Sequence, residues 1–234
     1  MFTDIHSHVI WGVDDGAEQK AETFRMLKEA AEDGIGRIIC TPHVTPGVCE
    51  FPEETFQEHF REALDYIEKE RLPLQLYRGA EILYTDHTPR LLRERRIATL
   101  AGSDYVLIEF NPTDSKEHIF EALRKVSGAG FIPVLAHVER YAAIAKIDLA
   151  AEIKKRFRAM MQVNARTLTR KQPFFRRRFF DTLFYEGLVD FVATDTHAIP
   201  GRETCMTAGM ESLKKKYGDA IARQIEQEPE ILFR

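Results

Sequence analysis

Hydrophobic and polar positions along the chain follow two alternating patterns. Short runs rich in Val, Ile and Leu predict β-strands, and between them apolar residues recur every three or four positions, as on the buried face of a helix. This regular alternation of strand and helix is typical of a parallel α/β fold. The pattern predicts seven strands, at residues 2–5, 37–41, 75–80, 105–108, 132–136, 160–163 and 190–194.

Four helices with one buried face are predicted between the strands. Their apolar positions are Ala21, Phe24, Leu27 and Ala31 in the first, Phe56, Phe60, Ala63, Leu64 and Ile67 in the second, Ile119, Leu123 and Val126 in the third, and Phe175, Phe179, Leu183 and Phe184 in the fourth. Gly34 and Gly128 follow the first and third, where glycine favours a helix end. Arg176, Arg177 and Arg178 form either the solvated side of the fourth helix or a docking surface for an acidic partner.

The domain organisation follows from the same pattern. No internal repeat, low-complexity tract or linker interrupts it, and a chain of 234 residues suits a barrel that forms one unit. We expect a single domain over residues 1–234, folded as a βα barrel with seven strands.

Composition and charge exclude several kinds of partner. The net charge of −4 gives no general attraction to nucleic acid, so DNA and RNA are not expected as ligands. No apolar run reaches the roughly 18 residues that span a bilayer, and the N-terminus lacks the features of a signal peptide. The cysteines Cys40, Cys49 and Cys205 form no Cys-x-x-Cys pair, which fits a reducing compartment. We expect a cytoplasmic protein with bystander thiols and no transmembrane segment.

Polar side chains follow every predicted strand. In parallel barrels the chemistry lies at the carboxyl ends of the strands, where the βα loops converge. Five of the eight histidines of the chain fall at these positions. In chain order the residues at the strand ends are His6 and His8, His43, Glu81, Glu109, His137, Asn164, and Asp195 with His197.

This set of residues predicts a cluster of metal ions. Any one strand-end histidine is more often a hydrogen-bonded structural residue, but histidines and carboxylates together, without cysteine, suit Mn²⁺, Fe or Zn²⁺. One ion takes about three protein ligands, so nine candidates indicate two or three divalent ions. The predicted ligands are His6, His8, Asp15, His43, Glu81, Glu109, His137, Asp195 and His197.

Such a cluster is suited to hydrolysis at phosphorus. Clustered metals generate hydroxide at neutral pH and clamp the attacking and leaving oxygens, and arginines grip phosphate oxygens with their planar guanidinium groups. Arg140 and Arg202 follow His137 and His197 closely in the sequence, although each could instead form a surface salt bridge, for example with Glu139. No cysteine is followed six positions later by arginine, so the phosphate loop of cysteine-dependent phosphatases is absent.

The ordered motifs of the chain resemble those of a known superfamily. The motifs are "DIHSHVIWGVDDGA", "TPH", "GAEI", "LIEF", "AHVERY" and "ATDTH". They resemble the polymerase and histidinol phosphatase (PHP) superfamily, and more closely its bacterial manganese-dependent protein-tyrosine phosphatases of the CpsB/YwqE type, associated with capsule and exopolysaccharide synthesis. The resemblance runs over nearly the whole chain.

The resemblance implies a fold, a metal centre and a substrate. The fold would be a distorted seven-stranded (β/α)7 TIM-like barrel with three metal ions, of which manganese is the expected element. The implied ligands are His6, His8, Glu81 and Asp195 for one ion, Glu81, Glu109 and His137 for a second, and Asp15, His43 and His197 for a third. Arg140 and Arg202 would bind the phosphate. The substrate would be phosphotyrosine on the tail of a tyrosine autokinase, with the enzyme acting at the inner face of the membrane.

The predicted reaction is attack of hydroxide on the phosphorus of phosphotyrosine, with His43 or His197 assisting through water. Three alternatives stay open: a histidinol-phosphate-type phosphatase, an amidohydrolase-like enzyme, and a silent binding module that keeps its metals for structure. The oligomeric state is also open, because the phenylalanine-rich helix suits a core or an interface.

Overall fold

The computed structural model describes residues 1–144, 147–198 and 200–234, without the side chains of residues 147, 175 and 176. The described strands are β1 (Phe2–Ser7), β2 (Ile35–Cys40), β3 (His43–Val44), β4 (Gln75–Arg78), β5 (Glu81–Leu83), β6 (Tyr105–Glu109), β7 (Ile132–Leu135), β8 (Met160–Asn164) and β9 (Phe191–Ala193). The α-helices are α1 (Lys20–Glu32), α2 (Glu53–Glu70), α3 (Thr88–Arg93), α4 (Lys116–Gly128), α5 (Ile147–Phe157), α6 (Ala165–Thr169), α7 (Phe174–Tyr185), α8 (Met206–Tyr217) and α9 (Asp219–Gln227). Short 3-10 helices are η1 (Leu100–Gly102), η2 (Val138–Arg140), η3 (Ala142–Ile144) and η4 (Glu228–Phe233).

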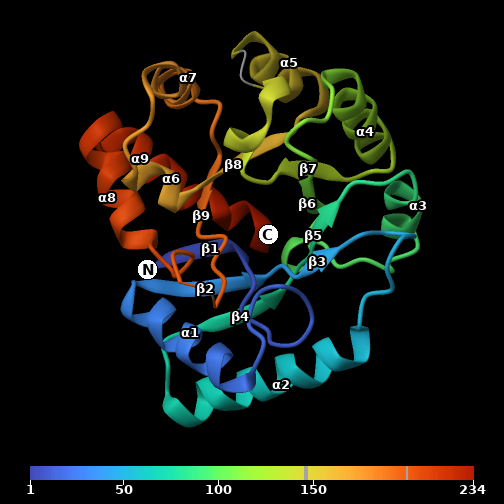
Figure 1. Ribbon diagram of the computed structural model, residues 1–234, viewed down its shortest axis with the longest axis vertical. Coiled ribbons are helices and arrows are strands. Elements are labelled where there is room, and N and C mark those ends of the chain that lie inside the picture. The colour runs from blue at the N-terminus through green and yellow to red at the C-terminus, as the bar shows by residue number, and fades with distance from the viewer. Residues whose placement is uncertain (145–146, 199) are drawn as a thin grey trace.

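The strands form a curled, parallel arrangement surrounded by helices (Figure 1). Hydrogen bonding divides them into a sheet of order β1-β2-β4 and a sheet of order β3-β5-β6-β7-β8-β9. The sheets meet where β2 leads into β3 and β4 leads into β5, and Glu81 N donates to Pro42 O there at 3.0 Å. On the other side, a bridge between Ser7 and Thr196 links the end of β1 to the segment after β9.

All seven predicted strand positions contain a strand, but the predicted seven-stranded barrel is not confirmed, because the hydrogen-bonded strands form separate sheets of three and six. Two interruptions have a physical cause. Pro42 has no N–H to donate to a ladder. Gly79 packs so tightly that an added Cβ would lie 2.7 Å from Ile39 Cγ2. Beyond these two residues the strands resume, and β3 and β5 have His43 and Glu81 as their first residues.

Apolar side chains fill both sides of the strands. The larger core cluster lies between the strands and the helices, and a smaller one contains Ile5, Ile39, Leu107, Val134 and Phe191 from five different strands. Leu100 of η1 and Leu232 of η4 also belong to the smaller cluster. These apolar residues precede the polar strand ends along the strands, so they form an apolar layer below the candidate site.

Two of the predicted helix faces need correction. In α1 the buried residues are Thr23, Met26, Leu27 and Ala30, whereas Ala21 is exposed. In α2 Phe56, Ala63 and Ile67 are buried as predicted, but Leu64 is exposed. The spacing of apolar residues does not fix how wide the buried face of a helix is. The contact between α1 and α2 determines which residues at the edges of these faces are buried, and in this contact Phe24 stacks on Tyr66 with ring centroids 3.8 Å apart.

The other two helices agree with the prediction where they are described. Ile119, Leu123 and Val126 are buried in α4. In α7 Leu183 and Phe184 are buried and Phe179 is half-buried, while the side chains of 175 and 176 lie outside the described residues. Arg177 and Arg178 are exposed. No helix in the described part of the chain is long and apolar enough to cross a membrane.

The close packing at Gly79 gives a test of the bend before β5. We expect Gly79→Ala to lower the free energy of unfolding by about 1–3 kcal/mol, because the new methyl group meets Ile39 and Thr41. Gly128→Ala is the matched control, since nothing lies within 4 Å of its added Cβ. Urea unfolding of both variants measures the difference. Equal midpoints would contradict the steric explanation.

Candidate metal centre

The nine side chains predicted as metal ligands come from six strand ends and the loop after β1, and they lie together. Each has an imidazole nitrogen or carboxylate oxygen within 4 Å of another member of the set. Three groups place ligand atoms close enough for one ion each: His8, Asp15, His43 and His197; His6, His8 and Glu81; and His43, Glu81 and Glu109.

His6 in β1 and His8 just after β1 both turn toward Glu81. His6 Nδ1 is 3.2 Å from Gln162 Oε1, and His8 Nδ1 is 2.7 Å from Asp14 Oδ2, so each Nδ1 carries the proton that it donates. The Nε2 atoms therefore face inward, 3.2 Å apart and each within 3.2 Å of Glu81 Oε2, where each can carry either a proton or a metal ion. The residues present therefore fit a metal ion.

Glu81 is the carboxylate at the middle of the cluster. It is 1% exposed, and its Oε2 lies 3.0 Å from His6 Nε2 and 3.2 Å from His8 Nε2. Burial raises the pKa of Glu81, but the charge of His6 and the hydrogen bond from His137 outweigh burial and hold the pKa well below its ordinary value. The carboxylate is therefore ionised although it is buried.

The pKa of His137 is shifted by the same group of charges that shifts the pKa of Glu81. Burial lowers the pKa of His137, but hydrogen bonds to Glu109 and Glu81 outweigh it and raise the pKa to about 9. Its Nε2 lies 2.8 Å from Glu81 Oε1. A centre that retains protons this strongly attracts positive charge, and metal ions compete with those protons for the same nitrogen atoms.

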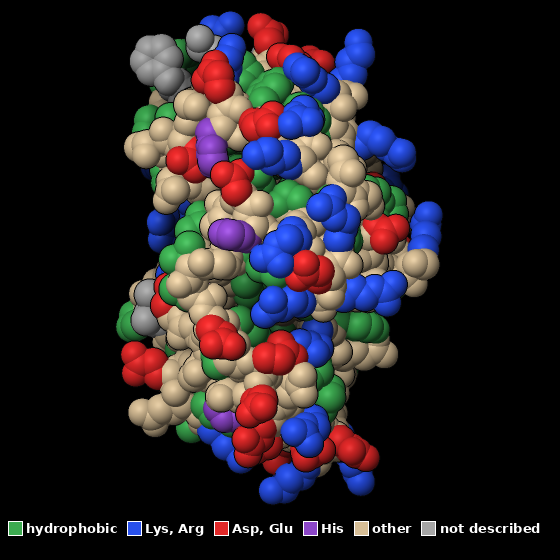
Figure 2. All heavy atoms as spheres, turned by 90° about the vertical axis from the view of Figure 1, so that its right-hand side faces the viewer, with side chains coloured by type: hydrophobic (Ala, Val, Ile, Leu, Met, Phe, Trp, Pro, Cys, Tyr) green, Lys and Arg blue, Asp and Glu red, His purple; other side chains and the backbone are tan. Residues whose placement is uncertain are grey.

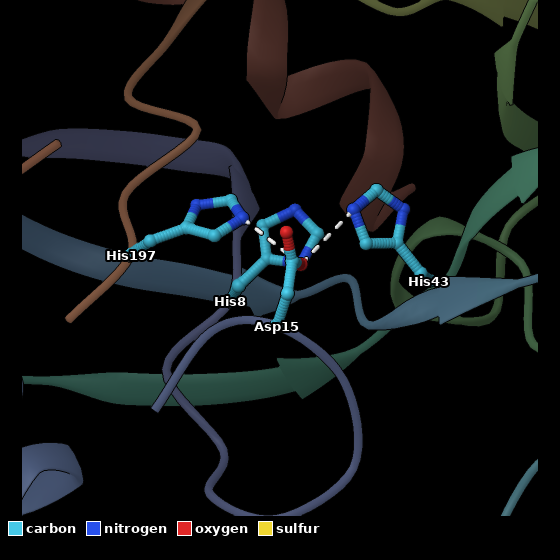
Figure 3. Close-up of side chains that lie close together, drawn as sticks. All are labelled: His8, Asp15, His43 and His197. Atoms are coloured by element: carbon cyan, nitrogen blue, oxygen red, sulfur yellow. Dashed lines mark ion pairs between the residues drawn. The ribbon is translucent and has the colours of Figure 1, made fainter. Parts of the chain in front are cut away.

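A second group of ligand atoms surrounds Asp15. Figure 3 shows Asp15 between His43 and His197, and its Oδ1 lies 3.3 Å from Nε2 of each. His197 Nδ1 lies 3.1 Å from Asp195 O, so Nδ1 is the donor and the lone pair is on Nε2. This buried Nε2 has no hydrogen-bond partner among the described residues. Burial, with the positive charges of His8 and Arg202, lowers the pKa of His197 to about 4, which keeps the imidazole neutral and able to bind metal.

The two predicted phosphate-binding arginines lie at the edge of the centre and contact the same carboxylate. Arg140 Nη2 donates to Asp195 Oδ2, and Arg202 Nη2 donates to Asp195 Oδ1 at 2.8 Å. Both arginines thus form a salt bridge, the alternative that the sequence left open, and the carboxylate is that of Asp195. Arg140 and Arg202 are 39% and 29% exposed, so both also reach solvent at the mouth of the site.

Two further residues were missed by the sequence analysis. Asp14 holds His8 Nδ1 and also accepts from His43 N at 3.1 Å, and Gln162 Oε1 contacts His6 Nδ1 while accepting from His137 N at 2.7 Å. Burial raises the pKa of Asp14, but the hydrogen bond to His8 outweighs it and lowers the pKa to about 2. Asp14 stands next to the predicted Asp15, and sequence order cannot tell which carboxylate turns inward.

The chain matches the sequence profile of a known family. The family is described as "Capsular polysaccharide synthesis, CpsB/CapC", and the match runs over residues 2–232. The chain belongs to this family. The predicted resemblance to the CpsB/YwqE group is thereby confirmed.

Individual relatives agree with the family assignment. The chain is 30% identical to the tyrosine-protein phosphatase CpsB of Streptococcus pneumoniae, over 95% of this chain and 93% of that protein. It is 29% identical to the tyrosine-protein phosphatase YwqE of Bacillus subtilis, over 99% of this chain and 91% of that protein. A solved structure described with YwqE and CpsB as "unique metal-dependent tyrosine phosphatases" superposes with a TM-score of 0.89 at 28% identity, covering 99% and 94% of the two chains.

A more distant solved structure shares the fold. Histidinol phosphate phosphatase from Lactococcus lactis superposes with a TM-score of 0.60 at 15% identity, covering 93% of this chain and 94% of that one. This likeness shows the architecture alone.

Asp14 provides a test of how the centre is held. Carboxylates that orient a metal-binding histidine contribute about 10- to 100-fold to metal affinity, so we expect Asp14→Asn to weaken Mn²⁺ binding by that factor. The exposed Asp65 of α2 gives the matched control Asp65→Asn. Titration of metal-free protein, with free Mn²⁺ followed by electron paramagnetic resonance, measures the affinity. Unchanged affinity in Asp14→Asn would show that His8 needs no carboxylate to orient it.

Proposed function

We propose that residues 1–234 form one metal-dependent protein-tyrosine phosphatase domain. The observation that carries this proposal is the arrangement of the site: three adjoining groups of histidine and carboxylate ligands, with Arg140 and Arg202 at the edge of the same centre. Membership of the CpsB/CapC family and the similarity to relatives named tyrosine-protein phosphatases support it.

The proposed centre binds two or three divalent ions, with Mn²⁺ preferred over Fe and Zn²⁺. His6, His8, Glu81 and Asp195 would hold one ion, Glu81, Glu109 and His137 a second, and Asp15, His43 and His197 a third. Two observations support this assignment: the Nε2 atoms of His6 and His8 face inward toward Glu81, and the buried Nε2 of His197 has no hydrogen bond among the described residues and lies 3.3 Å from Asp15 Oδ1. When bound, divalent ions at such a site acidify water and neutralise charge on phosphoryl oxygens.

The residues of the chain position the phosphate and neutralise it. Arg140 and Arg202 are anchored on Asp195 through one Nη2 atom each, and their other N–H groups would donate to phosphate oxygens as charge develops. The leaving phenolate has a pKa near 10, so it departs more readily than an alkoxide and needs little help from a general acid. Of the two histidines predicted to assist, His43 is 35% exposed and His197 is buried, so we assign the assistance through water to His43.

The proposed substrate is a phosphotyrosine protein, namely the tail of a tyrosine autokinase that regulates capsule or exopolysaccharide synthesis. The family description and the names of the relatives support this choice. The enzyme would act in the cytoplasm at the inner face of the membrane.

We also infer a distorted barrel of seven strands, in which β2 and β3 together count as one strand and β4 and β5 together count as another. Only two residues separate the members of each pair, and the Ser7–Thr196 bridge stands where such a barrel would close.

Metal removal tests the proposed activity. We expect protein stripped of metal to release no phosphate from a phosphotyrosine peptide, and Mn²⁺ to restore the release. Histidinol phosphate, assayed in parallel, should be a poor substrate. Failure of Mn²⁺, Fe²⁺ and Zn²⁺ alike to restore activity would refute the proposal, and faster turnover of histidinol phosphate would favour the small-molecule alternative.

Replacement of Asp195 tests the link between metals and arginines. Asp195→Asn keeps the shape of the side chain but removes the charge that faces His6, Arg140 and Arg202. We expect kcat to fall by more than roughly 100-fold, with less metal retained, because a ligand is lost along with the anchor of both arginines. Circular dichroism should show a folded protein. Full activity in this variant would contradict the assigned role.

A further inference from the structure

A groove of about 1240 Å³ lies beside the metal centre. Its walls are the loop 44–53, the last residue of β4, helix α3 and the segment that follows α3. Five arginines line it: Arg78, Arg90, Arg93, Arg95 and Arg96. We call it the arginine groove. Figure 2 looks onto the side of the molecule that carries α3 and shows Lys and Arg side chains gathered over the middle of this face.

The arginine groove is positive in a protein whose net charge is −4. The acidic residues in its lining are Glu50, Glu53 and Asp104. Arg78 contacts Glu53 at 2.6 Å, and Arg90 contacts Glu94 at 3.0 Å. Arg93, Arg95 and Arg96 are exposed, and no ion pair is recorded for them among the described residues. Three guanidinium groups are therefore available to an acidic ligand.

The backbone fixes these arginines in place. At the end of α3, Arg95 N donates to Leu92 O and Arg96 N donates to Leu91 O, both at 2.9 Å, which is the hydrogen-bond pattern of a Schellman motif. Arg95 has the left-handed φ of 55° that this motif requires. Leu91, Leu92 and Ile97 are buried beneath the turn. The backbone that carries the arginines is thus held by hydrogen bonds and by packing of the buried apolar residues.

The arginine groove begins next to the metal centre. Val44, which lines the groove, directly follows His43 in β3. The loop beyond it is held against the start of α3, because Thr85 Oγ1 donates to Pro46 O at 2.7 Å and Gly47 packs on the ring of His87. The groove therefore reaches β3 at the residue after a predicted ligand, and a peptide with its phosphotyrosine at the metal centre would enter the groove by crossing the end of β3.

We propose that the arginine groove binds an acidic stretch of the substrate protein, through Asp and Glu side chains next to the phosphotyrosine that is hydrolysed. This proposal rests on the proposed function. Arginine, with its planar donor fork, pairs with carboxylates in a bidentate manner. The recessed shape favours an extended chain over a flat lipid surface, and the charge of the groove is complementary to an acidic peptide.

Two double variants with the same change in net charge test the proposal. The groove variant is Arg93→Glu with Arg96→Glu, and the control is Arg177→Glu with Arg178→Glu on the exposed side of α7. Each is assayed on two phosphotyrosine peptides, one with Asp and Glu beside the phosphotyrosine and one with Asn and Gln in their place. p-Nitrophenyl phosphate, which is too small to reach the groove, reports the basal activity.

We expect wild-type enzyme and the control to show a lower KM for the acidic peptide. The groove variant should lose this preference, with a rise in KM of roughly five- to tenfold, the size expected for two ion pairs at a protein surface. Its kcat and its turnover of p-nitrophenyl phosphate should stay unchanged, and 0.5 M NaCl should remove the preference in the wild type. An equal KM for both peptides in the wild type, an undiminished preference in the groove variant, or an equal loss in the control would overturn the proposal.

Cys49 gives a readout that needs no catalysis, because it is exposed and lines the arginine groove. An acidic peptide with unphosphorylated tyrosine should slow alkylation of Cys49 by iodoacetamide in the wild type and not in the groove variant, as followed by mass spectrometry. Protection without any phosphatase activity would refute the proposed function and keep the groove. Activity without protection or peptide preference would refute the groove alone. Sedimentation with vesicles containing phosphatidylserine completes the test: a loss of vesicle binding in the groove variant with peptide preference intact would assign this surface to the membrane.

Discussion

The structure depends on one electrostatic arrangement, a buried carboxylate encircled by imidazoles. Glu81 is desolvated and ionised, and His6, His8, His43 and His137 each place a ring nitrogen within 3.2 Å of it. In an apolar interior such a set is stable only with added positive charge, whether protons or metal ions. The outer contacts of Asp14 and Gln162 then make chemical sense, because they fix which nitrogen of His8 and of His6 faces the centre.

The fold serves this arrangement through its irregularities. Two short interruptions, at residues 41–42 and 79–80, separate β2 from β3 and β4 from β5, and Pro42 has no N–H to donate there. β3 and β5 then begin with His43 and Glu81. In β1 the register with β2 shifts between Asp4 and Ser7, in the stretch that contains His6. Bulges and breaks of this kind commonly lie next to active sites, because they redirect side chains that a regular pleat would point elsewhere.

Much of this could be predicted from the sequence, for reasons that also explain the errors. Strand positions and the polar strand ends were predictable because burial in a parallel sheet gives continuous apolar runs. The division into two sheets was not, since the order in which strands hydrogen-bond is a tertiary property that the apolar pattern of each strand does not contain. Leu64 was assigned to a buried face by spacing alone, and the contact between α1 and α2 leaves it outside. Gln162 gave no signal, because one polar residue in a strand is usually structural.

The bridge between Ser7 and Thr196 has a consequence for how the protein matures. It joins the first strand of the chain to a segment near its C-terminal end, where Asp195 N also donates to His6 O at 2.9 Å. A ribosome releases His6 long before it makes Asp195 and His197, so a growing chain holds most of its candidate ligands with no means of closing the cluster around them. In the proposed centre, metal binding by the full set of candidate ligands therefore requires the chain up to His197, and a chain that ends earlier would retain metal poorly however well its first strands had formed.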